Sequence, residues 1–313
     1  MKLRQFELLC MLKKYSTISQ VAQESFTSQP AVSTAIKNLE SELGYPLLQR
    51  SNHGVQFTVE GMQVLEQAEI IMQAVDNIKN LSAADASGIS GTLRIGSIPH
   101  ICNSVLLNLQ LELQEEFPDL RLKVESYFNS DELVRRLERN LLDFIIVQDC
   151  DYDHRLTNAK ISDSRFQYMP LFKDSLSFTA PENHPLLRKP DVSAADLKDY
   201  PFAALQTAGL DYTRIRLGDV DYSGEIHSFN EPVHIRKFMQ ENNGFTILPL
   251  RAVIYSNMNY CIKLVPFSVS GVNWSTNAGC IYLYKDLGRT TRLFLNRLKC
   301  QCEDPRYTSL TTF

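Results

Sequence analysis

The chain has 313 residues, 44% of them hydrophobic, which is enough for two or three folding units with real cores. No apolar run reaches the ~18 residues of a membrane span, and the N-terminal MKLRQFELLCMLKKYS has lysines in its apolar stretch and no small-residue cleavage site. These features argue against a membrane partner and a secretory signal, and we expect a globular protein of the cytoplasm.

The net charge of −4 is unevenly distributed along the chain. Residues 1–58 carry six Lys and Arg against four Asp and Glu, residues 59–91 carry one against five, and residues 92–313 carry 25 against 27. The first segment is therefore the basic one, and only mildly so. This balance permits DNA binding, but phosphate contacts must come from a few well-placed side chains rather than from a broad positive field.

Cysteine and histidine usage predicts neither disulfides nor a metal site. The seven cysteines are an odd number with irregular spacing, and the six histidines form no pattern that zinc usually takes. Reduced thiols are the cytosolic default, and we expect no metal or other cofactor. Redox sensing at Cys102 is a minor hypothesis, because the sequence shows no resolving cysteine beside it and no cause for a lowered thiol pKa.

Three short helices are predicted near the N-terminus. Apolar residues at helical spacing indicate the first, and the second is expected to have Ser19 as its N-cap. The third is predicted to begin at Ser28, a good N-cap, with Pro30 in its first turn, and to end at Gly44. Three such helices, the last two joined by a brief turn, are typical of a helix-turn-helix.

The third helix has two different faces. Its apolar stripe consists of Val32, Ile36, Leu39 and Leu43. Its polar face consists of Gln29, Ser33, Thr34, Lys37 and Ser41. From the residues alone, an ordinary solvated surface explains this polar face as well as a recognition helix that approaches DNA bases.

Two further elements follow the third helix. SNHGVQFT (51–58) has a polar turn between two short potential strands, the size of a wing. A long helix is then predicted from Glu60 to about Ser82, and its heptad seam consists of Val64, Ala68, Ile71, Val75 and Ile78. We favour dimerisation over packing on the wing as the explanation of this seam. Residues 82–91 are rich in Ala, Ser and Gly and predict a hinge.

Residues 92–313 show the alternation of strands and helices that is typical of an α/β domain. Strands are expected at 92–97, 120–127 and 142–148, with helices between them, and the same alternation recurs after about residue 165. Such a pattern predicts parallel sheets with helices on both faces and ligands at the carboxyl ends of the strands. Two similar halves would leave a cleft between them, where a small molecule would bind.

The string SQPAVSTAIKNLESELGYPLLQR, followed by GVQFTVEGMQVLEQA, closely resembles the DNA-binding segment of LysR-type transcriptional regulators. The ordered elements of that family fall here at residues 28–31, 33, 39–40, 43–44, 47–50 and 58–61. The resemblance extends more loosely over nearly the whole chain, through TLRIGS, ENHPL, SAADLKDYPF and NNGFTILP. The chain departs from the common family pattern at 16–18 and 48–50; both departures keep the apolar site, so we expect small packing changes.

The resemblance implies a winged helix-turn-helix at residues 1–58, a linker and dimerisation helix with a hinge at 59–91, and a periplasmic-binding-protein-like effector domain at 92–313. Subdomain I of the effector domain would comprise about 92–163 and 268–313, and subdomain II about 164–267. The overall fold class would be α/β. The resemblance also implies a homodimer or homotetramer that binds double-stranded promoter DNA and activates or represses transcription, with RNA polymerase as a further partner.

The resemblance assigns the polar face of the third helix to DNA. Glutamine can pair with adenine, and serine or threonine with either kind of base edge, so Gln29, Ser33 and Thr34 are expected to contact bases and Lys37 a base or a phosphate. The wing is expected to contact the DNA backbone. The full set of expected DNA-binding residues is Gln29, Pro30, Ser33, Thr34, Lys37, Arg50 and His53.

Candidates for binding the effector, a small molecule, follow the ends of the predicted strands, where helix N-termini offer free N–H groups. In the first subdomain they are Ser97, Pro99, His100, Asn129, Ser130 and Gln148. By similarity to the family, Gln206, Thr207 and Thr246 of the second subdomain would face them. Helix capping explains Asn129 and Ser130 equally well, and a partly exposed surface position is the favoured explanation of His100.

The leading hypothesis is therefore a one-component transcription factor, in which a small molecule shifts the balance between two arrangements of the assembly. A small-molecule binding or transport protein is an alternative that would need export, and the sequence carries no signal for it. An enzyme is the other alternative, but the sequence has no glycine-rich phosphate loop, no Gly-x-Ser-x-Gly motif and no clustered carboxylate pair. We expect no catalytic residues.

Overall fold

The computed structural model describes residues 1–51, 54–80, 89–128, 130–150, 163–205, 216–217, 220–284 and 288–303. These residues form two compact units, the first built mainly by Met1–Ala86 and the second by Ser87–Glu138 and Leu142–Phe313. Each unit has its own hydrophobic core. Among the described helices, none has the length and hydrophobicity that crossing a bilayer requires.

The first unit begins with helices α1 (Leu3–Tyr15), α2 (Ile18–Glu24) and α3 (Gln29–Leu43). The predicted boundaries of α3 are confirmed, because the Ser28 side chain accepts a hydrogen bond from the Ala31 N–H and Gly44 ends the helix at φ 84°. The predicted cap of α2 was wrong. Thr17 caps that helix by accepting from the Gln20 N–H, and Ser19 lies inside the first turn.

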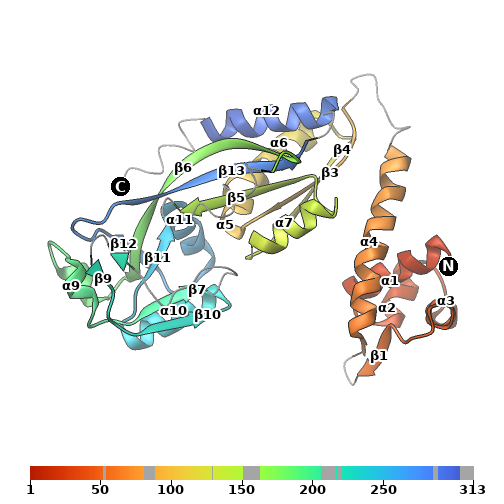
Figure 1. Cartoon of the computed structure of the whole chain (residues 1–313), viewed down its shortest axis with the longest axis horizontal. Coiled ribbons are helices and arrows are strands. Elements are labelled where there is room, and N and C mark those ends of the chain that lie inside the picture. The colour runs from red at the N-terminus through yellow and green to blue at the C-terminus, as the bar shows by residue number, and fades with distance from the viewer. Residues whose placement is uncertain are drawn as a thin grey trace. The chain divides into compact units, whose positions relative to one another are not determined.

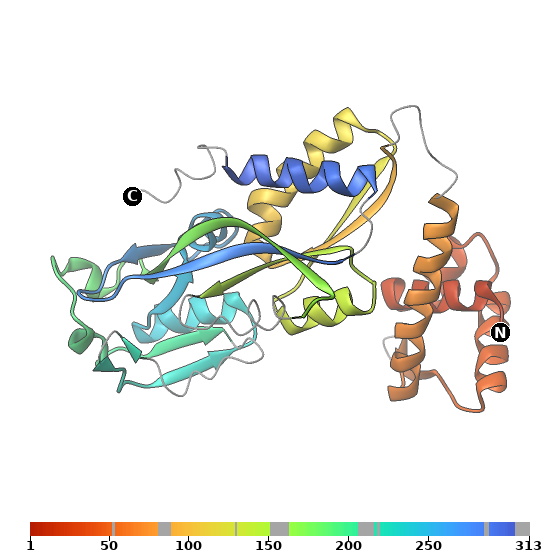
Figure 2. The same ribbon diagram turned by 45° about the horizontal axis from the view of Figure 1, so that its top comes forward.

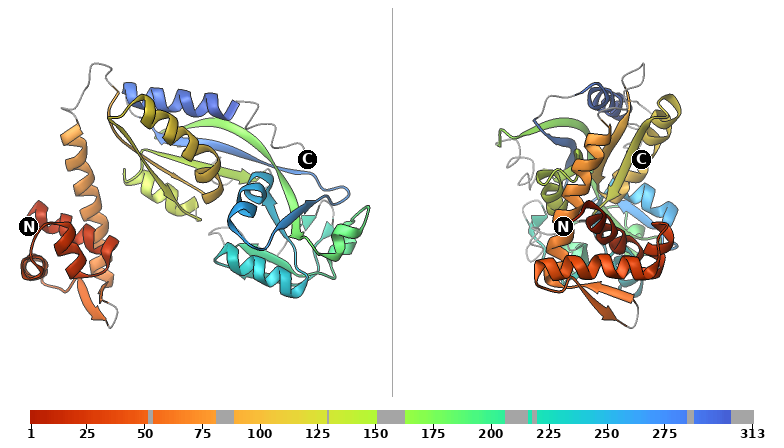
Figure 3. Two further views of the ribbon diagram at one scale, coloured as in Figure 1. Left: turned by 180° about the vertical axis from the view of Figure 1, so that it is seen from behind. Right: turned by 90° about the vertical axis from the view of Figure 1, so that its right-hand side faces the viewer.

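A two-stranded antiparallel hairpin, β1 (Leu48–Ser51) and β2 (Gly54–Phe57), follows α3 and leads into the long helix α4 (Val59–Asn80). Figure 3 shows α1 crossing α4 and the hairpin at the start of α4. The core between the helices includes Leu65 and Ala68, which are fully buried. The first part of the heptad seam therefore packs inside the unit's own core, against α1. Only the later part is exposed and available to a partner helix, since Ile78 is 67% exposed.

Close contacts tie the chain just before the hairpin to the start of α4 and to the end of α3. The Thr58 hydroxyl donates to the Pro46 carbonyl (2.8 Å) and accepts from the Gly61 N–H (2.9 Å). A Cβ at position 61 would lie 2.0 Å from the Leu47 carbonyl oxygen, so this close approach needs glycine. The Glu40 carboxylate accepts from the N–H group of Leu47 (2.8 Å), which ties the end of α3 to the same point.

The second unit is organised around a seven-stranded mixed sheet with the order β11-β6-β13-β5-β3-β4, with β12 paired to β6. The strands are β3 (Gly91–Ser97), β4 (Leu120–Ser126), β5 (Phe144–Cys150), β6 (Phe166–Pro181), β11 (Thr246–Pro249), β12 (Leu264–Phe267) and β13 (Trp274–Leu283). The prediction of parallel sheets holds for β3, β4 and β5, but β6, β11, β12 and β13 pair antiparallel. The segment Phe166–Pro181 forms one continuous strand, β6.

Helices cover both faces of the parallel part of this sheet. On one face lie α5 (Pro99–Ile101), the π-helical turn η1 (Cys102–Leu106), α6 (Leu107–Glu116) and α12 (Arg289–Glu303). On the other face lies α7 (Ser130–Glu138), which packs Leu133 and Leu137 against Ile145. Figures 1 and 2 show α12 and α6 on one face and α7 on the opposite one.

The remaining elements surround the second half of β6. They are η2 (Pro185–Arg188), α9 (Ala194–Leu197), β7 (Phe202–Leu205), β8 (Arg216–Leu217), β9 (Val220–Asp221), β10 (Ile226–Phe229), α10 (Pro232–Asn242) and α11 (Leu250–Asn259). Helix α10 is capped at its C-terminal end by Asn243, which has φ 49°. Helix α11 and strand β7 were not predicted. Their apolar side chains, with those of α10, build a separate small core around Met239 and Val253.

Candidate DNA-binding surface and effector site

The two faces of α3 are clearly separated. Val32, Ile36 and Leu39 are at most 3% exposed and hold the helix to α1 and α2. On the opposite face Gln29, Pro30, Thr34 and Lys37 are exposed, and Ser33 is half-buried. The donors and acceptors of this face can reach a partner without a change of fold, which is what reading base edges requires.

Gln29 has a specific partner within the unit. Its side-chain amide donates to the Ser19 hydroxyl at 2.5 Å, across the turn between α2 and α3. The amide is thereby held at the N-terminal end of α3. Binding an adenine through both amide atoms would exchange this hydrogen bond for contacts to the base.

Of the two candidate DNA contacts in the wing, the structure describes only the first. Arg50 lies in β1, where its backbone pairs with Val55 of β2. His53 lies outside the described residues. The contribution of both side chains to DNA binding remains a prediction.

In the second unit, Ser97 occupies the last position of β3 and is fully buried. Its hydroxyl donates to the Ile146 carbonyl of β5 at 2.8 Å, and its own carbonyl accepts from the Tyr127 N–H at 2.9 Å. Both contacts join neighbouring strands. Ser97 therefore supports the carboxyl ends of β3, β4 and β5, and its expected role as a direct effector ligand remains a prediction.

His100 and Gln148 meet at the carboxyl ends of β3 and β5. The His100 Nε2 lies 2.6 Å from the Gln148 side-chain oxygen, and the Gln148 amide donates to the Thr276 hydroxyl on β13. Burial lowers the pKa of His100 to about 4, against a smaller opposing effect of its hydrogen bond to Gln148. His100 is therefore neutral at pH 7 and, at half-buried exposure, part of an interstrand network; its role in effector binding remains a prediction.

Two charged residues that the sequence did not single out complete this network. Asp174 on β6 lies opposite Thr276 of β13, is 1% exposed, and accepts from the Arg251 N–H at the start of α11 (3.2 Å). Burial raises the pKa of Asp174, and the Arg251 backbone and side chain and the Gln148 amide oppose this shift. The Arg251 guanidinium, 1% exposed, lies 4.4 Å from the centre of the Phe172 ring.

We refer to His100, Gln148, Asp174, Arg251 and Thr276 as the interstrand network. Its members come from α5, β5, β6, α11 and β13, which are far apart in the sequence. The pairing of β6 with β13 brings Asp174 and Thr276 together. No local sequence signal marks such a set, because its members are distant in the sequence and come together only in the fold.

The other effector candidates have different surroundings. Pro99 begins α5, directly before His100, and Ser130 is the first residue of α7. Thr246 is 3% exposed, and its carbonyl accepts from the buried Thr179 hydroxyl on β6. Asn129, Gln206 and Thr207 lie outside the described residues. The structure thus brings His100 and Gln148 into contact, and the role of the others in binding remains a prediction.

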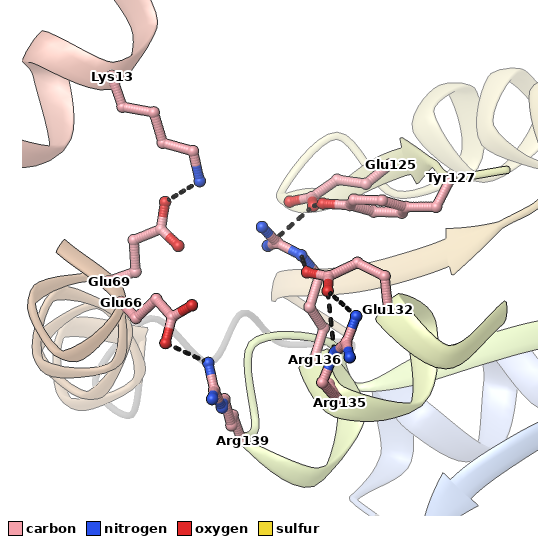
Figure 4. Close-up of polar contacts among 9 residues, drawn as sticks. All are labelled: Lys13, Glu66, Glu69, Glu125, Tyr127, Glu132, Arg135, Arg136 and Arg139. Atoms are coloured by element: carbon pink, nitrogen blue, oxygen red, sulfur yellow. Dashed lines mark hydrogen bonds and ion pairs between the residues drawn. The ribbon is translucent and has the colours of Figure 1, made fainter. Parts of the chain in front are cut away.

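A surface cluster fixes the turn that leads from β4 into α7 (Figure 4). The Tyr127 hydroxyl donates to Glu125 at 2.5 Å, and the Arg136 guanidinium lies 4.9 Å from the Tyr127 ring. Arg136 also donates to Glu132 at 3.0 Å, one helical turn away. The cluster holds the chain on both sides of Ser130, a candidate effector contact.

Four described thiols are wholly or partly buried, which disfavours their thiolate form. Burial raises the pKa of Cys10 and Cys102 to about 11 and that of Cys302 to about 12, and it also raises the pKa of Cys280. Within the described part of the chain, no group of three or more His, Cys, Asp or Glu side chains could hold a metal ion.

Family models match both units. The model described as "LysR substrate binding domain" matches residues 86–302, and the one described as "Bacterial regulatory helix-turn-helix protein, lysR family" matches residues 3–62.

Curated relatives cover most of the chain. The hydrogen peroxide-inducible genes activator of Haemophilus influenzae is 26% identical over 273 residues, which span 85% of this chain and 86% of that protein. The DNA-binding transcriptional dual regulator OxyR of Escherichia coli K12 is 28% identical over 261 residues, which span 81% of this chain and 80% of that protein.

Solved structures share the fold at low identity. CbnR, a LysR family transcriptional regulator, matches with a TM-score of 0.63 at 15% identity, over 97% of this chain and 100% of that chain. A full-length variant of OxyR from Pseudomonas aeruginosa matches with a TM-score of 0.58 at 20% identity, over 96% of this chain and 94% of that chain. The expected architecture, a helix-turn-helix unit followed by a substrate-binding domain, is confirmed, and the chain belongs to the LysR family of transcriptional regulators.

Proposed function

We propose that this chain recognises promoter DNA through the exposed face of α3 and changes transcription when a small-molecule effector binds its second unit. The single observation that carries the DNA-binding part is the separation of the two faces of α3. Its apolar side is buried, while Gln29, Thr34 and Lys37 are exposed at the other side. In support, a structure of CbnR was solved in complex with its target DNA, and it matches this chain with a TM-score of 0.62.

We propose that the protein acts as a homodimer or homotetramer in the cytoplasm, with RNA polymerase as a further partner and without enzymatic activity. The relatives are transcriptional regulators. The later part of α4, where Ile78 is 67% exposed, is the proposed dimerisation surface. Two copies related by a two-fold axis would read two half-sites, so the binding site would be a pseudopalindrome.

A gel shift and a footprint with the region upstream of the protein's own gene test the DNA-binding proposal. We expect salt-sensitive binding that protects a pseudopalindromic site. Replacing Ser33 with Ala should change the preference among base sequences, whereas Arg50→Ala should weaken binding to all sequences about equally. Absence of salt-sensitive, footprintable binding would contradict the proposal.

For the effector we propose a site between subdomain I (about 92–163 and 268–313) and subdomain II (about 164–267). The proposed contacts are Ser97, Pro99, His100, Asn129, Ser130, Gln148, Gln206, Thr207 and Thr246. The contact between His100 and Gln148 at the carboxyl ends of β3 and β5 supports this placement.

A thermal-shift screen of metabolites on the full chain would identify the effector. His100→Ala and Asn129→Ala should both weaken the response to a compound that raises the melting temperature of the wild type. An unchanged response in both variants would contradict the proposed site.

A further inference from the structure

The turn between α2 and α3 contains an aromatic residue in an unusual backbone conformation. Phe26 has φ 51°, in the left-handed region. Its N–H donates to the Gln23 carbonyl (3.2 Å), and the Thr27 N–H donates to the Ala22 carbonyl (2.9 Å). This pair of hydrogen bonds is the Schellman motif that ends many helices, and its left-handed position normally holds glycine or asparagine.

Neither the fold nor the solvent favours phenylalanine at this position. A left-handed conformation is strained for a bulky side chain because Cβ crowds the following carbonyl oxygen. The other non-glycine residues with positive φ in the described ranges are short and polar: Ser16, Asn140 and Asn243. The Phe26 side chain is also 98% exposed, so it gains nothing from burial in this unit.

The position of Phe26 points to a partner. It lies two residues before Ser28, the N-cap of α3, and three before Gln29. Three peptide units span at most about 11 Å, so Phe26 borders the exposed N-terminal end of α3. This end is where a recognition helix meets base edges and the adjoining sugars.

We propose that Phe26 is a DNA contact that packs its ring on apolar surface of the duplex, a thymine methyl group or a deoxyribose, beside the bases that α3 reads. The inference rests on the proposed DNA-binding function and extends it to a residue of the turn. Phenylalanine is suited to the thymine methyl, which is the apolar feature of the major groove. In the complex the ring leaves water, which offsets the strain that it imposes on the free protein.

Replacing Phe26 with Asn tests the inference, because stability and binding should change in opposite directions. Asparagine tolerates the left-handed conformation, so the melting temperature of the full-length protein should rise by ~4 °C. Affinity for the duplex from upstream of its own gene should fall about tenfold. Phe26→Leu should retain more affinity than Phe26→Asn, since it keeps an apolar side chain.

Salt dependence separates this contact from a phosphate contact. Phe26 neutralises no phosphate, so the slope of log K against log salt should be the same for Phe26→Asn and the wild type, whereas Lys37→Ala should reduce it by about 1 if Lys37 contacts a phosphate. Met62→Gln, which removes another exposed apolar side chain (47%) from α4, is the matched control and should leave affinity unchanged.

The outcomes are distinguishable. If the wild type does not bind the duplex, the proposed function fails. If the wild type binds and Phe26→Asn binds equally well, the inference alone is overturned. It is also overturned if Phe26→Asn changes the oligomeric state in sedimentation velocity without DNA, because the ring would then contact a second copy. A duplex with uracil in place of thymine separates the two apolar surfaces. If only the wild type loses affinity for this duplex, the contact is with the methyl group. If the wild type and Phe26→Asn lose affinity equally, the contact is with deoxyribose.

Discussion

On α3 the polar side chains Gln29, Thr34 and Lys37 are exposed, whereas in the second unit the polar side chains of Asp174, Arg251 and Thr276 are each 1% exposed and lie between strands. The first arrangement leaves donors and acceptors available to a partner molecule. The second satisfies them largely within the protein, where a buried polar group without a partner would be destabilising. Polar residues of one chain thus form the proposed recognition surface in one unit and define strand positions in the other.

Because of this difference, substitutions of polar residues should have different effects in the two units. Exposed polar side chains on α3 contribute little to folding, so their replacement should affect DNA binding and leave stability nearly unchanged. Members of the interstrand network contribute to both stability and the geometry of the candidate effector site. The first unit depends instead on close backbone contacts around its hairpin.

The largest effect is expected at such a backbone contact. Gly61→Ala would place a Cβ 2.0 Å from the Leu47 carbonyl oxygen and force the start of α4 away from the hairpin. We expect a loss of about 3 kcal/mol in the free energy of unfolding of the first unit, measured by calorimetry. Gly44→Ala is the control: its added Cβ meets nothing within 4 Å, and its φ of +84° alone should cost about 1 kcal/mol. Equal stability of the two variants would contradict the close-approach argument.

A smaller loss is expected from the interstrand network. Gln148→Ala would remove the hydrogen-bond partner of both His100 and Thr276 and should destabilise the second unit by about 2 kcal/mol. The chain has one tryptophan, Trp274 on β13, so urea unfolding followed by its fluorescence reports on this unit. Gln110→Ala is the control. The half-buried Gln110 side chain donates a single hydrogen bond to the Leu122 carbonyl, so its loss should reduce stability less. If both variants unfolded at the same midpoint urea concentration as the wild type, the stabilising role of Gln148 would be contradicted.

The stability of the second unit should depend on pH in the way that a neutral His100 implies. Its pKa in the folded protein is about 4, below the ordinary value of 6.5, so its contribution to stability is fully present above pH 6.5 and is lost as the pH falls toward 4. Between pH 6 and pH 5 this group should cost about 1 kcal/mol. In His100→Gln the dependence over that interval should be weaker by this amount; an unchanged pH profile would contradict the pKa assignment.

The smallest effect concerns the thiols of the folded protein. Cys261 and Cys300 are exposed and should react readily with Ellman's reagent, whereas Cys102, Cys280 and Cys302 are buried, and their thiol pKa values are raised. These three should react only after unfolding, with no change in stability beforehand. Rapid oxidation of Cys102 by peroxide in the folded protein would contradict this, and would bring the chain closer to the peroxide-inducible activators among its relatives.

The local features of the fold were predictable from the sequence, and the long-range ones were not. The boundaries of α3 follow from Ser28, Pro30 and Gly44, whose effects act within one helical turn. The antiparallel pairing of β6 and β13 depends on contacts between residues about a hundred positions apart. Asp174 and Arg251 were missed for the same reason, because neither forms a motif with its sequence neighbours. His100 was identified, but its lowered pKa depends on packing that only the fold provides.

The division of α3 into a buried and an exposed side also bears on how such a regulator can evolve. Val32, Ile36 and Leu39 fix the position of the helix, and Gln29, Thr34 and Lys37 can vary without loosening it. A duplicated copy of the gene could therefore drift at these exposed positions and acquire new target promoters one substitution at a time, without passing through an unfolded intermediate. The same scaffold can then support new binding specificities, while substitutions in its hydrophobic core would reduce stability.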